Sequence, residues 1–126
     1  MDELAVIAIE LRPDERPQEE PVLAGYFRVL GEKHRLRILQ ALMRSELCVC
    51  ELEEDLGISS SLLAHHLKVL RRAGLIQVRR GVRDARWLYY SVNGEAYARL
   101  CRLLAAALPA RDLPPQAQCG SNCRCG

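Results

Sequence analysis

The sequence predicts a mainly α-helical domain of five helices with one two-stranded β-hairpin. Apolar residues recur at helical spacing in five segments, residues 21–30, 33–43, 48–56, 60–73 and 93–108. Two strand-like segments rich in β-branched and aromatic residues, residues 75–80 and 86–92, flank a loop at residues 81–85. The length of 126 residues allows one domain with a modest core, which dimerisation would enlarge.

We expect this domain to span residues 21–108. Pro21 suits the first position of a helix, and Pro109 stops the last one. Residues 1–20 form an N-terminal arm that holds seven acids and two arginines. Residues 109–126 form a flexible tail that is rich in cysteine.

Composition excludes several classes of protein. No apolar run approaches the roughly 20 residues that a membrane span needs, and the acidic start Met-Asp-Glu does not fit a signal peptide. We therefore expect a cytoplasmic protein with no membrane partner, in which six reduced cysteines serve metal binding or redox chemistry. The sequence has no phosphate-binding glycine loop and no nucleophile elbow, so we expect no enzyme.

Residues 48–73 predict a helix-turn-helix. Gly57 can adopt the left-handed conformation after a helix, and Ser59 can cap the next one. In the second helix, Leu63, Leu67 and Leu70 face inward. The outward face is expected to contact DNA, because small hydroxyls allow close approach to phosphates and base edges. Its expected DNA-binding residues are Ser60, Ser61, Leu62, His65 and Lys68.

The hairpin that follows is predicted to be a wing. Residues 59–92 hold seven bases and one acid, a charge distribution typical of a nucleic-acid surface and also of a solvated charged face. A wing beside a basic helix would place arginines on the DNA backbone or in the minor groove. The residues expected to do so are Arg79, Arg80, Arg83 and Arg86.

Cys48 and Cys50 open the first helix of the helix-turn-helix. Thiolates select soft or thiophilic ions. On a regular helix, two residues that are two positions apart are separated by about 200° around the axis. The two thiols would therefore lie on either flank of Val49. One ion shared by both thiolates would therefore have to unwind or twist residues 47–50, and that distortion would tilt the DNA-reading helix.

Further ligands are expected from the tail, where Cys119, Cys123 and Cys125 follow one another closely. They could complete the site of Cys48 and Cys50, from the same subunit or a partner, or hold an ion of their own. Three other residues are predicted to be structural: Cys101 in packing, His34 exposed to solvent and His66 in the core.

The last helix is apolar on most sides, and one small domain cannot bury all of that surface. A second copy would bury it. The sequence therefore predicts a homodimer that pairs through the helices at residues 21–30 and 93–108.

Three motifs together resemble the ArsR/SmtB family of winged-helix, metal-responsive repressors. They are Glu46-Leu-Cys-Val-Cys-Glu-Leu52, His66-Leu-Lys-Val-Leu-Arg71 and Arg86-Trp-Leu-Tyr-Tyr90, and the resemblance covers residues 22–108. The first motif is similar to that of arsenic-sensing members and of cadmium/lead-sensing relatives. The resemblance implies a homodimer that represses a resistance operon when empty and leaves double-stranded operator DNA when the ion binds.

The chain departs from the family pattern in three places. Glu53 stands where arsenic sensors have a third cysteine, and residues 1–30 lack the cysteines of the cadmium/lead sensors. Residues 93–108 contain no histidine, which argues against a zinc sensor that uses the last helix. We expect arsenic(III), with antimony as a further inducer, at Cys48, Cys50 and one tail cysteine. The alternatives are cadmium(II) or lead(II) at four thiolates, a thiol-redox or persulfide switch, and an interaction module that does not bind DNA.

Overall fold

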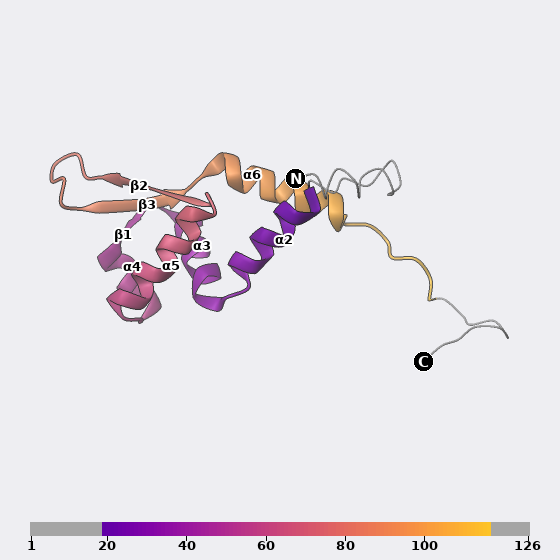
Figure 1. Ribbon diagram of the computed structural model, residues 1–126, viewed down its shortest axis with the longest axis horizontal. Helices are drawn as coiled ribbons and strands as arrows, with labels where there is room; N and C mark the ends of the chain where they lie inside the picture. Colours follow the sequence, from indigo (N-terminus) through magenta and orange to yellow (C-terminus); the bar gives the residue numbers. More distant parts are fainter. Residues whose placement is uncertain (1–18, 117–126) are drawn as a thin grey trace.

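The computed structural model describes residues 19–116 and shows five helices and three strands there. In chain order they are α2 (Glu19–Leu30), α3 (Lys33–Arg44), β1 (Leu47–Cys48), α4 (Val49–Leu56), α5 (Ser60–Arg72), β2 (Ile76–Arg80), β3 (Leu88–Val92) and α6 (Gly94–Ala107). The β2–β3 hairpin projects from one end, α2 and α6 lie side by side at the other, and α3, α4 and α5 lie between them (Figure 1). The predicted fold class, a winged helix-turn-helix, is confirmed.

The sheet has three strands, in the antiparallel order β1-β3-β2, where the sequence predicted two. The prediction missed β1 because its residues look like the start of a helix. Leu47 pairs with Tyr90 and Cys48 with Tyr89, on the edge of β3 that the hairpin partner leaves free. α4 therefore begins at Val49, and Cys48 belongs to the strand rather than to the helix.

The loop between β2 and β3 spans residues 81–87, two residues longer than predicted. The Gly81 N–H donates to the Trp87 carbonyl (2.7 Å), and the Trp87 N–H donates to the Asp84 carbonyl (3.1 Å). A Cβ at position 81 would lie 2.6 Å from the Asp84 carbonyl oxygen, so this closure requires glycine.

The helix-turn-helix is built as its turn residues predict. Gly57 ends α4 with φ +65°, and Ser59 Oγ accepts the Leu62 N–H at 3.2 Å at the start of α5. Asn93 caps α6 in the same way, with its side-chain oxygen 3.4 Å from the Ala96 nitrogen. These contacts fix where each helix begins before any tertiary packing is considered.

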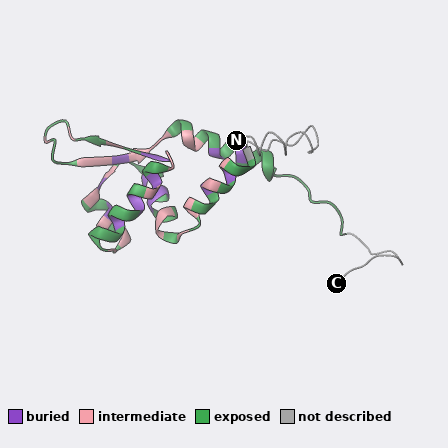
Figure 2. Ribbon diagram, viewed as in Figure 1, coloured by how far each residue is buried: buried purple, intermediate pink, exposed green. Residues whose placement is uncertain are grey.

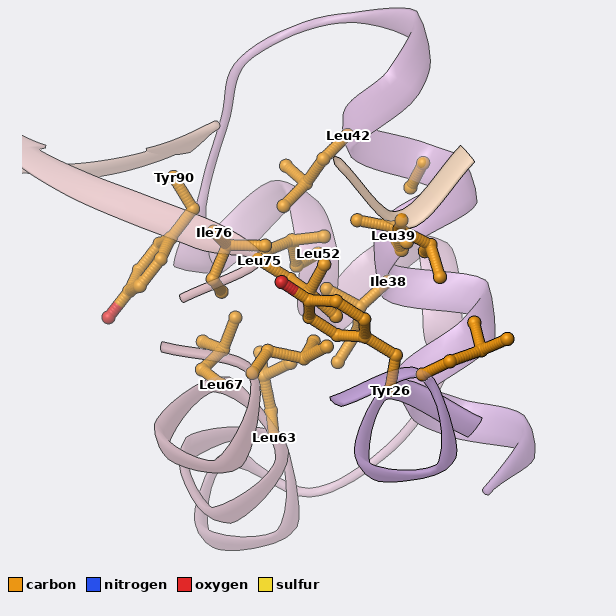
Figure 3. Close-up of a cluster of buried hydrophobic side chains, with 14 of the residues drawn as sticks. Tyr26, Ile38, Leu39, Leu42, Leu52, Leu63, Leu67, Leu75, Ile76 and Tyr90 are labelled. Carbon is orange, nitrogen blue, oxygen red and sulfur yellow. The ribbon is translucent and has the colours of Figure 1, made fainter. Parts of the chain in front are cut away.

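One hydrophobic cluster joins all the helices to the base of the hairpin (Figure 3). Its largest fully buried side chains are Ile38, Leu52, Leu63, Leu70 and Leu75. On α3, the apolar Leu36 and Met43 are 43% and 48% exposed, whereas Leu39 is buried. The buried face of α3 is instead set by Ile38, Leu39, Ala41 and Leu42.

Burial is uneven along the molecule, and much of α6 and part of α2 face solvent (Figure 2). The first helix also begins at Glu19, two residues before the predicted start at Pro21. No helix among residues 19–116 is long and apolar enough to cross a membrane. The tail cysteines Cys119, Cys123 and Cys125 lie outside the described residues.

Candidate nucleic-acid interface and thiol site

Helix α5 presents one polar face to solvent. Ser61, Leu62, His65 and Lys68 are exposed there, while Leu63 and Leu67 on the other face are buried. Lys68 makes no side-chain hydrogen bond or ion pair with any described residue, so its charge is available to a partner. The geometry is that of a recognition helix, with a short polar group near its N-terminus and a cation two turns further on.

Ser60, the fifth residue expected to bind DNA on this helix, has a contact within the chain. Its Oγ donates to a Glu53 carboxylate oxygen of α4 at 2.7 Å. Between the two helices and β3 lies a pocket of about 330 Å³, whose lining includes Val49, Ala64 and Lys68. Helices α4 and α5 are therefore linked by this hydrogen bond, by the shared lining of the pocket and by the buried cluster that includes Leu52 and Leu63.

The wing arginines differ in how they are engaged. Arg79 makes two hydrogen bonds to the Glu46 carboxylate, at 2.9 and 2.6 Å, and its guanidinium lies 4.8 Å from the centre of the Tyr89 ring. The bonds to Glu46 raise the pKa of Arg79 above its ordinary value. Arg86 is paired with Asp84 at 2.7 Å, which lowers the pKa of that carboxyl.

The other two wing arginines lie near the loop. Arg80 donates to the Ala85 carbonyl at 2.9 Å and helps to hold the loop. Arg83 is exposed and makes no side-chain hydrogen bond or ion pair with the rest of residues 19–116. Arg83 is therefore the wing arginine best placed to reach a phosphate without first breaking a contact.

The two candidate thiol ligands have different environments. Cys48 is buried, 7% exposed, and has extended backbone angles as the residue before α4, whereas Cys50 is exposed in the first turn of that helix. The prediction that both cysteines lie on one regular helix is therefore wrong. Val49 between them is half-buried, and Leu52 is the fully buried residue of α4.

Cys48 is held at two places. Its backbone pairs with Tyr89 of β3, and its N–H donates to the Glu51 carboxylate at 3.1 Å in a capping box. Burial raises the pKa of the Cys48 thiol, an effect that the Glu51 backbone N–H partly offsets. An ion that draws Cys48 toward Cys50 must disturb these contacts at the junction of strand and helix.

Cys101, predicted to serve in packing, is exposed on α6 among the described residues. Residues 19–116 leave the outer face of that helix uncovered, and an interface with a second copy would bury this thiol. Phe27, Leu104 and Leu108 share this exposure, at 45%, 37% and 66%.

The structure brings together a group that sequence reasoning missed: Glu32, His34 and His66. His66 is buried as predicted, but His34 is half-buried rather than exposed, and their rings stack with centroids 5.4 Å apart. Glu32 caps α3 by accepting the backbone N–H groups of His34 (2.8 Å) and Arg35 (3.1 Å). The one local signal for this group in the sequence was an acidic residue, Glu32, immediately before the start of a helix. No local pattern connects Glu32 with His66.

The exposure of Lys68 leads to a direct prediction for DNA binding. Lys68→Glu is expected to weaken binding to operator DNA by about tenfold or more and to lower its salt dependence, because a phosphate-facing cation is lost. Fluorescence anisotropy at several salt concentrations measures both quantities. Lys33→Glu, the same change in charge on α3, should have a much smaller effect. Equal losses in the two variants would show that only net charge matters.

A helix-turn-helix with a polar second helix, followed by an arginine-bearing hairpin, defines a winged-helix DNA-binding domain. Residues 32–78 match the family model of bacterial regulatory proteins of the arsR family. The chain belongs to this family, also called ArsR/SmtB, whose members are helix-turn-helix transcriptional regulators that bind DNA.

Similar proteins cover most of the described region. A transcriptional repressor SmtB homolog of Synechocystis is 37% identical over 90 residues, which are 71% of this chain and 66% of that protein. The nodulation protein NolR of Rhizobium meliloti is 32% identical over 93 residues, 74% of each chain. The crystal structure of NolR from Sinorhizobium fredii superposes with a TM-score of 0.59 at 31% identity, covering 80% of this chain and 97% of that one.

Two further relatives have names that mention resistance. The arsenical resistance operon repressor of Bacillus subtilis is 37% identical over 70 residues, covering 55% of this chain and 64% of that protein. The cadmium resistance regulatory protein CadC of Listeria innocua is 29% identical over 86 residues, covering 68% and 70%.

Proposed function

We propose that this protein is a repressor that binds operator DNA when it is free of metal and is released when arsenic(III), or the chemically similar antimony(III), binds its cysteines. One observation supports this most strongly. The cysteine pair lies at the start of α4, and that helix contacts the recognition helix through Glu53, Ser60 and the pocket beside Val49. The similarity to an arsenical resistance repressor favours the same inducer.

The donor groups fit a thiophilic ion. Cys48 and Cys50 supply sulfur ligands that select such ions over Mg²⁺ or Ca²⁺. A third sulfur would come from Cys119, Cys123 or Cys125, in the same subunit or a partner. Bound there, the ion supplies bonds to sulfur that the empty protein lacks, and hence a difference in free energy between the two states.

The protein then has to transmit this difference to DNA. Drawing Cys48 out of its buried position disturbs its pairing with Tyr89 and its capping contact with Glu51. Movement at the start of α4 displaces Val49 from the pocket wall and strains the hydrogen bond from Ser60 to Glu53. A shift from 1:99 to 99:1 in the ratio of released to DNA-binding conformations requires the ion to bind the released conformation more tightly by about 5.5 kcal/mol.

Operator binding is proposed to require a homodimer, which presents two recognition helices to two half-sites. The helices at residues 21–30 and 93–108 are the proposed interface, because α2 and α6 lie side by side and expose Phe27, Leu104 and Leu108. Because its proposed target is operator DNA, we also propose that the protein acts in the cytoplasm.

A cadmium(II)- or lead(II)-responsive repressor is the second candidate, favoured by the similarity to CadC. It would use four thiolates, two from residues 48–50 and two from the tail. X-ray absorption spectroscopy of the loaded protein separates the two by the number of sulfur neighbours, three for arsenic and four for cadmium.

The decisive experiment titrates arsenite into the full-length protein bound to the DNA upstream of its own gene. Arsenite is expected to release the protein under reducing conditions, and magnesium chloride is expected to leave the complex intact. A complex that persists at saturating arsenite contradicts arsenic induction, and release by cadmium alone would favour the second candidate. Release by an oxidant without any metal, with a disulfide found by mass spectrometry, would instead indicate a redox switch.

A further inference from the structure

We propose that Glu32, His34 and His66 form a second cation site, separate from the cysteines, that takes a borderline divalent ion such as Zn²⁺. The three side chains each offer one ligand atom, and these atoms lie within 4.8 Å of one another. Glu32 and His34 come from the start of α3, and His66 comes from the middle of α5. The proposal does not depend on the thiol site.

The distances are close to those of a zinc site. Nδ1 of His34 is 3.1 Å from one carboxylate oxygen of Glu32, and Nε2 of His66 is 3.6 Å from the other. Ligand atoms about 2.0–2.2 Å from a tetrahedral Zn²⁺ are about 3.3–3.5 Å apart. Each histidine nitrogen lies nearest a different oxygen of Glu32, so the three side chains must move closer together before one carboxylate oxygen and both nitrogens reach this spacing.

The chemistry of the donors also fits. Two imidazole nitrogens and one carboxylate oxygen favour Zn²⁺ over the oxygen-preferring Mg²⁺ and leave a fourth position for water. Partial burial raises the pKa of Glu32, but the backbone N–H groups of Arg35 and His34 lower it, and the net shift is downward. The carboxylate is therefore charged. Burial lowers the pKa of His66, although the nearby Glu32 carboxylate acts in the opposite direction.

Arg35 is expected to limit the affinity of this site for a cation. Its NH1 lies 3.5 Å from Nδ1 of His66, while its Nε donates to the Val29 carbonyl at 2.6 Å. If a cation binds Nε2 of His66, the proton of the ring is on Nδ1. Nδ1 can then no longer accept a hydrogen bond from Arg35, so this weak contact must break. The guanidinium also repels the ion, and we therefore expect weaker binding here than at the thiolates.

A cation at this site would join the start of α3 to the recognition helix. His66 is on the inner face of α5, directly beside the exposed His65 of the DNA-facing side. Binding would therefore hold α5 in place, whereas an ion on Cys48 and Cys50 is proposed to shift it. The expected result is a more heat-resistant protein whose DNA affinity is retained.

The test uses the full-length chain with all six cysteines replaced by serine, so that no thiolate competes, and isothermal titration with zinc chloride. We expect one Zn²⁺ per chain and a rise in Tm. His34→Gln is expected to weaken binding by at least about tenfold, since one of three protein ligands is lost. His65→Gln, a change to the adjacent exposed histidine, should leave affinity unaltered.

The absence of saturable binding, or equal affinity in the His34→Gln variant, would overturn the proposal. If the cysteine-free chain does not fold, as judged by circular dichroism, NMR of the histidine rings in the wild-type protein decides. Saturating Zn²⁺ should then shift the ring signals of His34 and His66 by much more than those of His65, whose ring lies 5.2 Å from that of His66 but binds no ion. Unshifted His34 and His66 signals would likewise refute the site.

Discussion

Replacing Cys50 with serine is expected to abolish the response to arsenite while leaving operator binding by the ion-free protein unchanged. Cys50 is exposed, so the loss of its sulfur removes a ligand without creating a cavity. In the wild type, arsenite should weaken operator binding by about 5–150-fold, the usual range of allosteric coupling. Anisotropy of labelled operator DNA, with and without arsenite, measures both states.

Two further substitutions make this prediction specific. Cys48→Ser is expected to behave like Cys50→Ser and to fold well, because serine is a favoured residue at the N-cap position that Cys48 occupies. Cys101→Ser removes an exposed thiol from α6 and should leave release by arsenite intact. If the Cys48 and Cys50 variants were both still released like the wild type, the inducer would have to bind elsewhere.

Leu63→Ala is expected to lower the free energy of unfolding by about 2–5 kcal/mol, a large part of the stability of a small domain. Leu63 is completely buried on the inner face of α5, within the cluster shown in Figure 3. Its truncation loses apolar burial and leaves a cavity between α5 and the core. Urea unfolding at one fixed protein concentration measures the change, since the stability of a dimer depends on concentration.

The neighbouring Leu62 provides a matched control. It has the same side chain one position earlier on the same helix, but it is 39% exposed and faces the proposed DNA surface. Leu62→Ala is expected to cost less than about 1 kcal/mol of stability, and any larger effect should appear in operator affinity. Equal destabilisation by the two substitutions would contradict the orientation of α5 described here.

Local signals were sufficient where the contact that fixes the structure is itself local. Gly57 and Ser59 predicted the turn, because each acts on backbone groups within a few residues, and Asn93 caps α6 in the same local way. The apolar spacing of residues 60–70 predicted the inner face of α5 for the same reason. The enrichment of two segments in β-branched and aromatic residues predicted the hairpin, although not the length of its loop.

The thiol site was predicted only in part, because a distant strand determines the conformation of Cys48. The sequence from residue 48 onward has a helical pattern, yet residues 47 and 48 pair with β3 and form a third strand. The consequence is functional. One sulfur is buried at a strand end and the other is exposed on a helix, so the distortion expected on binding lies at their junction rather than within a helical turn.

By itself, the sequence determined the class of fold, the order of the helices and the placing of a cysteine pair beside the DNA-reading unit. Periodicity, helix caps and turn residues encode these features over short stretches of chain. Tertiary structure alone decided that Cys48 is buried, that Arg79 is bound to Glu46, and that Glu32 and His34 meet His66. Each of these depends on residues more than 30 positions apart, which only packing around a shared core brings close together.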